Sequence, residues 1–198
     1  MTALDPTSRR QSVAYERRRL RLIADHARGE VLDLGYAQLP NPYLPGPRTV
    51  GVDLAAPAAP TGYSEELVGS VLDLASVLGR RRFDTVIAAE LIEHLEEPYA
   101  FLRATHAALR DDGRLVLSTP NPIAFPTLLM EMTRAKRWFY TEDHTFYFTA
   151  RWVERMLANT GFALERIQPV GIWLPVGCIP SSPIWLSYQL IYLARKRM

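Results

Sequence analysis

A glycine and an aspartate follow two short apolar runs of this chain, at positions where parallel strands would end. Gly35 closes the run 30–34, and a glycine there allows a sharp turn and the close approach of a ligand to the backbone. Asp53 closes the run 48–53, where a carboxylate can accept both hydroxyls of a ribose. Either residue alone is as well explained by a plain turn glycine or a surface aspartate. Together they predict a nucleoside site.

Other residues qualify by the same argument, because ligands of an open parallel sheet bind beyond the carboxyl ends of its strands. We therefore take as candidates the residues at or just beyond the carboxyl end of each expected strand. They are Asp33, Leu34, Gly35, Tyr36, Asp53, Leu54, Asp73, Leu74, Glu90, Leu91, Thr119, Pro120 and Asn121.

The elements that position these residues alternate between apolar runs and helical patterns. Strands are expected at 30–34, 48–53, 67–71, 83–89, 113–118, 162–170 and 186–194, with a turn at 111–113. Helices are expected at 8–28, 98–110 and 150–159, the last capped by Thr149. This alternation predicts an α/β, Rossmann-like, doubly wound, mostly parallel seven-stranded sheet with helices on both faces.

Proline interrupts the places where the first two crossover helices should lie. Residues 36–48 contain Pro40, Pro42, Pro45 and Pro47, so at most a turn or two of helix can form there. Residues 55–63 are also rich in proline. We expect both crossover helices to be short or absent.

The motifs, taken in order, resemble those of class I S-adenosylmethionine-dependent methyltransferases over about residues 30–170. The matching segments are VLDLG at 31–35, VGVD at 50–53, DL at 73–74, FDTVIAAELIEHL at 83–95, LRDDGRLVLSTPNP at 109–122 and GF at 161–162. Each segment is weak alone, and the series is specific. The resemblance implies S-adenosylmethionine as the cofactor.

The resemblance also implies a role for each position. The Gly35 backbone would lie against the methionine part of the cofactor, and Asp53 would hold the ribose. Asp73 would accept from the adenine amino group, with the Leu74 backbone beside the ring. Glu90 and Leu91 would line the floor near the transferred methyl. The chain departs from the family at the loop after the first strand, which usually has two or three glycines. Here it has only Gly35, and Tyr36 could cover or obstruct the cofactor.

Two histidines are the candidate catalytic residues. If the acceptor is a hydroxyl, its proton must be removed by a general base or with the help of a metal. His94 and His144 are the candidates, whereas His26 and His106 fall in expected helices.

A metal is the alternative to a histidine base. Glu90, Glu93 and His94 have helical spacing, and with His144 they are similar to the metal cluster of small-RNA 2′-O-methyltransferases. The competing interpretation, which we adopt, is that Glu93 complements a helix N-terminus and His94 hydrogen-bonds within the site, with no metal.

Two segments outside these motifs bear on the acceptor. Residues 123–148 form either an acceptor-site lid or an ordinary packed helix. They include Arg134, Lys136 and Arg137 beside Trp138, Phe139, Tyr140, Phe146, Tyr147 and Phe148. Residues 1–28, which we separate from a methyltransferase domain at 29–198, predict a basic helix. Its face is either solvated or a docking surface for an anionic substrate or lipid headgroup.

Net charge, cysteine content and the distribution of charged residues limit the partners and the compartment that we expect. A net charge of +2 demands neither nucleic acid nor a membrane as partner, and the lone Cys178 fits a reducing cytoplasm. The stretch 167–194 has no charged residue, but four prolines interrupt it, so we expect strands and an apolar loop with at most weak membrane-surface contact. A homodimer is compatible with this composition.

The combined expectation is O-methylation of a small molecule, a saccharide or a lipid-linked acceptor. Two alternatives stay open. One is a metal-dependent RNA 2′-O-methyltransferase, and the other is a non-catalytic module that kept the fold for binding.

Overall fold

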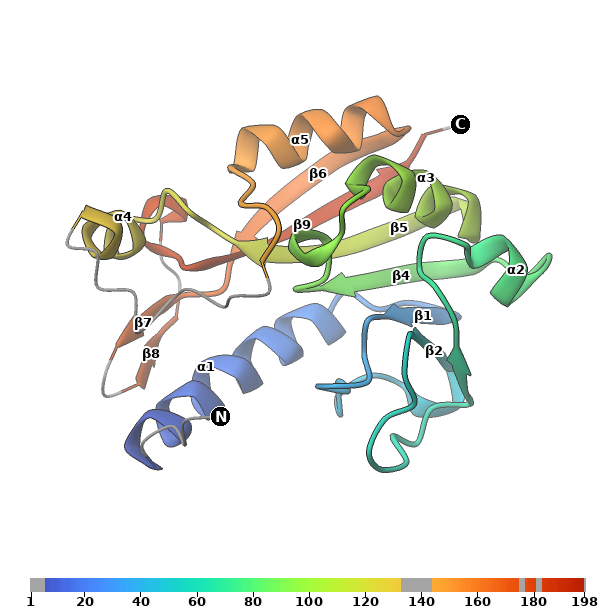
Figure 1. The fold of residues 1–198 in the computed structure, drawn as a ribbon, viewed down its shortest axis with the longest axis horizontal. Helices are drawn as coiled ribbons and strands as arrows, with labels where there is room; N and C mark the ends of the chain where they lie inside the picture. The colour runs from blue at the N-terminus through green and yellow to red at the C-terminus, as the bar shows by residue number, and fades with distance from the viewer. Residues whose placement is uncertain (1–5, 133–143, 175–176, 181–182, 198) are drawn as a thin grey trace.

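The computed structural model describes residues 6–132, 144–174, 177–180 and 183–197, and a seven-stranded sheet forms its centre (Figure 1). The strand order is β3-β2-β1-β4-β5-β9-β6. The strands are β1 (Val31–Leu34), β2 (Thr49–Asp53), β3 (Glu65–Val68), β4 (Phe83–Ala89), β5 (Leu109–Pro120), β6 (Phe162–Pro169) and β9 (Gln189–Lys196). β1 to β5 pair in parallel, and β9 runs antiparallel between β5 and β6. The predicted mostly parallel seven-stranded sheet is confirmed.

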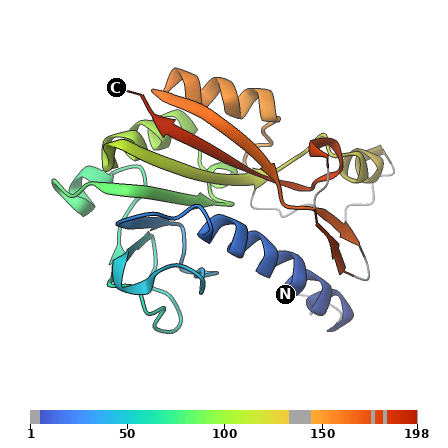
Figure 2. The ribbon, with the colours of Figure 1, turned by 180° about the vertical axis from the view of Figure 1, so that it is seen from behind.

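Helices cover both faces of this sheet (Figures 1 and 2). The helices are α1 (Pro6–Ala24), α2 (Leu74–Leu78), α3 (Pro98–Ala108), α4 (Phe125–Met132) and α5 (Ala150–Asn159). Three single turns also occur, η1 (Gly46–Arg48), η2 (Ile92–His94) and η3 (Ile184–Leu186). α3 and α5 lie on one face and α1 on the other.

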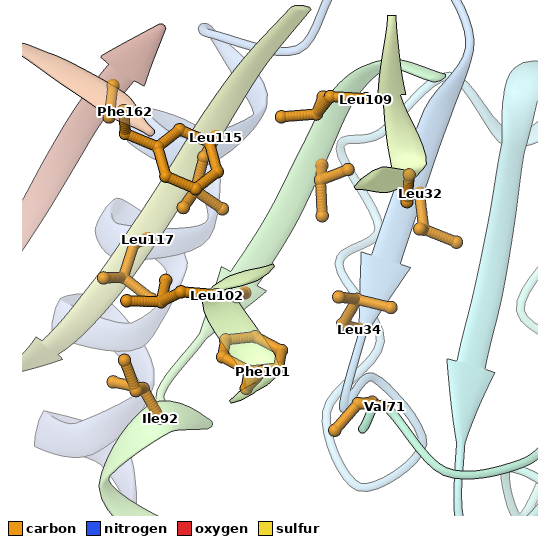
Figure 3. Packing of buried hydrophobic residues seen from close by; sticks show 14 of the residues in the cluster. Leu32, Leu34, Val71, Ile92, Phe101, Leu102, Leu109, Leu115, Leu117 and Phe162 are labelled. Atoms are coloured by element: carbon orange, nitrogen blue, oxygen red, sulfur yellow. The ribbon is translucent and has the colours of Figure 1, made fainter. Parts of the chain in front are cut away.

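Alternation along each strand divides the core between the two faces. Leu32 and Leu34 belong to the larger cluster, which Phe101 and Leu102 of α3 complete (Figure 3). Val31 belongs to the second cluster, with Tyr15 of α1. The intervening strand residue Asp33 therefore faces α1, and this places a carboxylate beneath the N-terminal helix.

The crossovers 35–48 and 54–64 contain no α-helix, only the turn η1, as the proline content predicts. Tyr36 covers part of the sheet surface that a crossover helix would otherwise cover. Its side chain is 3% exposed, and a Cβ on Gly51 of β2 would come within 2.5 Å of its ring. Tyr36 thus packs down on the sheet, where the absence of a side chain on Gly51 leaves room for it.

Several predicted boundaries differ from the structure. α1 ends at Ala24 rather than at 28, and the expected turn at 111–113 is part of β5, next to an irregular register opposite Phe83 and Thr85. β3 spans Glu65–Val68 rather than 67–71, because it pairs in register with residues 50–53 of β2. Thr149 occupies the N-cap of α5, but its side chain makes no capping hydrogen bond.

The apolar stretch 167–194 holds more structure than expected. Besides the end of β6 and most of β9, it contains η3 and a small hairpin of β7 (Ile172–Leu174) and β8 (Gly177–Ile179). Among the helices that the structure describes, none has the length and apolar character needed to cross a bilayer.

Candidate functional site

A cavity of about 580 Å³ lies at the carboxyl ends of β1, β2 and β4. The strand order reverses between β1 and β4, which is where open α/β sheets bind ligands. Ten of the predicted site residues line this cavity: Asp33, Leu34, Gly35, Tyr36, Asp53, Leu54, Glu90, Leu91, His94 and His144. The sheet therefore brings most of the predicted residues together.

The turn after β1 requires glycine on two counts. Gly35 has φ 71°, a left-handed conformation that side chains disfavour. A Cβ at this position would also lie 2.8 Å from a methyl carbon of Leu91. The side chain of the next residue, Tyr36, turns onto β2, where it lies over Gly51.

Asp53 anchors the loop that follows Gly35. Its Oδ2 accepts a hydrogen bond from the Ala37 backbone N–H at 2.8 Å, and its Oδ1 accepts a longer one, 3.4 Å, from Ala55. The carboxylate is partly exposed and lines the cavity. It is positioned by backbone contacts and keeps acceptor capacity for a ligand.

Asp33 lies deeper, with 4% of its surface exposed. The hydroxyl of Tyr63 donates to its Oδ2 at 2.7 Å. Burial raises the pKa of this carboxyl to about 7, opposed by the Tyr63 hydrogen bond and the nearby positive charge of Arg19. A ligand cation beside Asp33 would favour its ionised form.

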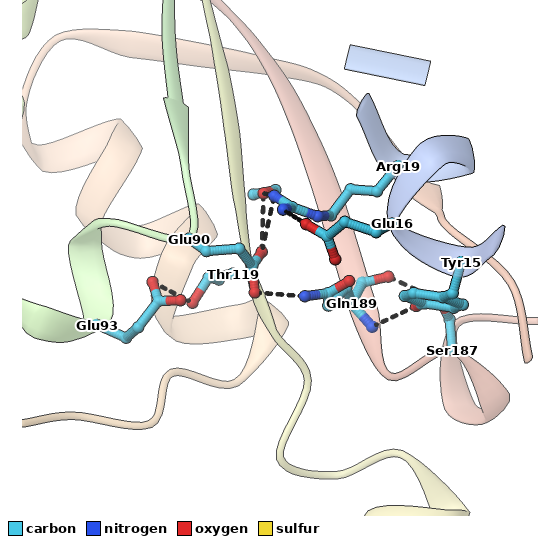
Figure 4. A network of polar contacts seen from close by, with 9 residues as sticks. Tyr15, Glu16, Arg19, Glu90, Glu93, Thr119, Ser187 and Gln189 are labelled. Carbon is cyan, nitrogen blue, oxygen red and sulfur yellow. Dashed lines mark hydrogen bonds and ion pairs between the residues drawn. The ribbon is translucent and has the colours of Figure 1, made fainter. Parts of the chain in front are cut away.

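Glu90 is held by residues from three elements (Figure 4). Its φ of 52° is the one positive value for a non-glycine residue in the described part of the chain. Ser118 donates to Oε1 at 2.8 Å and Gln189 donates to Oε2 at 2.6 Å, while the Arg19 guanidinium lies 3.9 Å away. Burial raises the pKa of Glu90, and the charge of Arg19 opposes that rise. Glu90 therefore joins β4 to β5, β9 and α1.

Arg19 was not predicted as a site residue. It projects from α1 into the cavity wall, is 4% exposed and pairs with Glu16 as well as with Glu90. Its Nε has no hydrogen-bond partner in the described structure. The sequence signal was the arginine-rich helix, but seven similar arginines gave no reason to choose this one. Leu20, Gln38, Leu39 and Asn41 also line the cavity and were likewise missed.

Asp73 and Leu74 do not line this cavity. β3 ends at Val68, and Asp73 instead caps α2 by accepting from the Ser76 N–H at 3.3 Å. Both residues border a separate, smaller hollow of about 110 Å³ beside α2 and α3. The predicted contact of Asp73 with adenine stays a prediction.

Glu93, His94 and His144 form a cluster at the cavity. One ligand atom from each lies within 4.8 Å of the other two, and the two imidazole rings meet edge to face at 4.7 Å. The Glu93 carbonyl accepts hydrogen bonds from Thr145 and Phe146, which fixes the segment that carries His144. Glu93 is 1% exposed, Thr119 donates to its Oε2, and its Oε1 has no partner in the described structure. Burial raises the pKa of Glu93 to about 9, and the nearby Glu90 adds to the rise.

The predicted lid at 123–148 is described only in part. α4 and residues 144–148 belong to the described structure, whereas 133–143, with Arg134, Lys136 and Arg137, lie outside it.

The sheet order, a cavity at the switch point and an acidic residue at the end of β2 are the arrangement found in nucleotide-binding α/β folds. A family model described as a methyltransferase domain matches residues 8–167. The chain belongs to this family, and its fold is that of the class I S-adenosylmethionine-dependent methyltransferases.

Individual relatives agree with this assignment. The ubiquinone biosynthesis O-methyltransferase of Ruegeria pomeroyi is 30% identical over 94 residues, which are 46% of this chain and 37% of that protein. The chain thus spans well under half the length of this curated relative.

Two solved structures share the fold. A methyltransferase from Thermotoga maritima, described as a possible histamine N-methyltransferase, gives a TM-score of 0.74 at 14% identity, over 96% of this chain and 94% of that one. The 1,6-didemethyltoxoflavin-N1-methyltransferase of Burkholderia thailandensis was solved with S-adenosylhomocysteine. It gives a TM-score of 0.63 at 19% identity, over 96% of this chain and 83% of that one.

Proposed function

We propose that this protein transfers a methyl group from S-adenosylmethionine to a small-molecule acceptor. The observation that carries the proposal is the single cavity at the β1/β4 switch point, which contains Gly35, Asp53 and Asp33 together with Arg19. S-adenosylmethionine supplies an electrophilic methyl carbon on a sulfonium. The chain's own residues must hold the two ends of that cofactor and align the acceptor.

Each part of the cofactor has a chemical counterpart in the cavity. Asp53 is the acceptor for the ribose hydroxyls, and the glycine turn at Gly35 leaves room for the cofactor backbone. The ammonium of the amino-acid end pairs with Asp33 and the carboxylate with Arg19. We propose these roles from charge and position, since the cavity wall contains the carboxylates of Asp33 and Asp53 and the buried guanidinium of Arg19.

We propose that the acceptor is a hydroxyl and that His94 or His144 removes its proton. Both imidazoles line the cavity beside Leu91, at the end where the transferred methyl would lie. The name of the Ruegeria pomeroyi relative, an O-methyltransferase, supports an oxygen acceptor. Its substrate is not assigned to this chain. The lone Cys178 supports the reducing, cytoplasmic setting that we expect.

Titration calorimetry with S-adenosylhomocysteine tests the cofactor site. The wild-type protein should bind it, and Asp53→Ala should weaken binding about tenfold or more, because charge-assisted hydrogen bonds to the ribose are lost. Asp25→Ala is the matched control, since Asp25 is exposed and follows α1 away from the cavity. No heat at millimolar ligand would favour a non-catalytic binding module instead.

A metal-dependent reaction is the second candidate, and the cluster of Glu93, His94 and His144 favours it. One carboxylate oxygen and two imidazole nitrogens are donors suited to a transition-metal ion, and the partnerless Oε1 of Glu93 fits such a ligand. Binding of Co²⁺, followed by its visible absorption, should then vanish in His144→Ala, and chelation should abolish activity. Full turnover in excess chelator would exclude this candidate.

A further inference from the structure

The charged groups around the cavity favour a cationic ligand. Asp33, Asp53 and Glu90 contribute carboxyl groups, whereas Arg19 is the one arginine or lysine among the described residues that line the cavity. Arg19 is already shared between Glu16 and Glu90. The two histidines apart, three carboxyl groups and one guanidinium therefore line the cavity, and a ligand with net positive charge balances this wall better than a neutral one.

The groups around Glu90 favour its ionised form. The Arg19 guanidinium donates to the Ser118 hydroxyl oxygen at 3.4 Å, so the Ser118 hydroxyl can donate its own proton to Oε1 of Glu90, 2.8 Å away. The side-chain amide of Gln189 donates to Oε2 at 2.6 Å (Figure 4). Both oxygens of Glu90 thus accept hydrogen bonds, and the Arg19 guanidinium lies 3.9 Å from Oε1. Such contacts stabilise a carboxylate against the cost of burial.

The backbone of Glu90 has a conformation that this residue type rarely adopts. Its φ of 52° lies in the left-handed region, which costs a residue with a side chain conformational energy. Its N–H donates to the Ser118 carbonyl at 3.0 Å, which holds this conformation against β5. The side chain is 19% exposed and lines the cavity. Backbone strain of this kind is concentrated at functional sites, so the position of Glu90 calls for a role toward a ligand.

Glu90 also lies beside the middle of the proposed cofactor site. In the sheet, β1 lies between β2, which ends at Asp53, and β4, which Glu90 follows. Gly35, which follows β1, lies close to Leu91, since a Cβ on Gly35 would be 2.8 Å from a methyl carbon of Leu91. A ligand that extends from Asp53 across Gly35 therefore meets Glu90 and Leu91 next.

We propose that Glu90 selects the cationic S-adenosylmethionine over the neutral S-adenosylhomocysteine. The sulfonium of S-adenosylmethionine carries a positive charge, which S-adenosylhomocysteine lacks. Attraction to the Glu90 carboxylate strengthens binding of the methyl donor only, so the spent cofactor is exchanged more readily for a new one. Glu90 is thus a specificity-determining residue. This inference rests on the proposed function, because both ligands must occupy the cavity.

Calorimetry with three ligands tests this selection without any methyl transfer. They are S-adenosylmethionine, S-adenosylhomocysteine and sinefungin, whose amine supplies a positive charge near the position of the sulfonium. Wild-type protein should bind both cationic ligands at least about fivefold more tightly than S-adenosylhomocysteine, because a charge near a buried carboxylate is only weakly screened. No acceptor is present, so the measurement reports binding alone.

Three variants separate the charge of Glu90 from its shape. Glu90→Gln should weaken binding of both cationic ligands about fivefold or more and change the affinity for S-adenosylhomocysteine less than about threefold, because only the charge is lost. Glu90→Asp keeps the charge and should keep the preference. Glu96→Gln is the matched control, since Glu96 is exposed and does not line the cavity. It should leave all three affinities unchanged.

The inference is wrong if the wild-type protein binds the three ligands equally, or if Glu90→Gln keeps the preference. A preference lost equally in Glu90→Asp and Glu90→Gln would also overturn it, because the side chain would then have only a structural role. If Glu90→Gln does not fold, the wild-type preference and its retention in Glu90→Asp decide. Wild-type protein that binds none of the three ligands would instead contradict the proposed function itself.

Discussion

At the scale of single residues, opposite charges meet at one end of the cavity. Asp33 and Arg19 are both 4% exposed, and the charge of Arg19 acts on the Asp33 carboxyl. Buried charges of this kind are expensive unless they have partners. An amino-acid zwitterion would offer Asp33 a partner of opposite sign, and Arg19 a further one besides Glu16 and Glu90.

Arg19→Met tests the carboxylate partner. It should weaken binding of S-adenosylhomocysteine about 10- to 100-fold, because a charge-assisted contact to the ligand carboxylate is lost. Binding of 5′-methylthioadenosine, which lacks the amino acid, should change little. Arg17→Met, at an exposed position on the same helix, is the control. Equal losses for both ligands would mean that Arg19 has only a structural role.

Asp33 predicts a pH dependence. Because its pKa is raised to about 7, the carboxyl carries a proton below that pH, and a ligand ammonium must displace the proton. Affinity for S-adenosylhomocysteine should therefore fall about tenfold per pH unit below pH 7 and level off above it. Calorimetry from pH 5.5 to about 8 measures this, and Asp33→Asn should give weaker, nearly flat binding. A sloping profile in that variant would assign the proton to another group.

The sequence predicts the site residues that lie at strand ends, but not those that other elements bring to the cavity. Gly35, Asp53 and Glu90 could be predicted, because a strand end determines the edge at which its next residue lies. Arg19 could not, because its place depends on how α1 packs, which no local pattern encodes. Asp73 was expected beside the others because β3 was placed three residues too late at its C-terminal end.

At the scale of elements, the loop after β1 covers the part of the sheet that a crossover helix would otherwise cover. Tyr36 occupies the space above Gly51, and its ring lies 5.3 Å from that of Tyr63, whose hydroxyl holds Asp33. The absence of the helix was predictable from proline, whereas the Tyr36–Gly51 contact was not, since it joins two segments in space.

Gly51→Ala tests this contact. The added Cβ would meet the Tyr36 ring at 2.5 Å, so the free energy of unfolding should fall by about 2 kcal/mol. Urea denaturation measures the loss. In a double-mutant cycle with Tyr36→Ala, the two losses should sum to more than the double variant shows, because removing the ring removes the clash. Strict additivity would indicate that Tyr36 does not lie over β2.

At the scale of the whole molecule, α1 contributes to the hydrophobic core on one face of the sheet. Ile23 and Tyr15 are 1% and 4% exposed and pack in the second cluster with Val31 and Ile191. Sequence periodicity predicted the helix, but it could not decide between a solvated appendage and a core element. We expect residues 1–28 and 29–198 to unfold as one cooperative unit.

Ile23→Ala tests this expectation. It should lower the free energy of unfolding of the entire protein by about 3 kcal/mol, with a single transition, because it leaves a cavity between α1 and the sheet. Leu22→Ala, at a half-buried neighbour, should cost clearly less. Circular dichroism and tryptophan fluorescence should report the same midpoint. An unchanged main transition would make α1 an independent appendage.

The polar network around Glu90 has a consequence for biosynthesis. Arg19 comes from near the start of the chain and Gln189 from near its end, and the Tyr15 hydroxyl accepts from the Gln189 backbone N–H at 3.2 Å. During translation, the strands β1 to β6 are all synthesised before Gln189 is added. This network is therefore completed only when β9 leaves the ribosome, and a nascent chain that stalls before β9 would lack the hydrogen bond from Gln189 to Glu90.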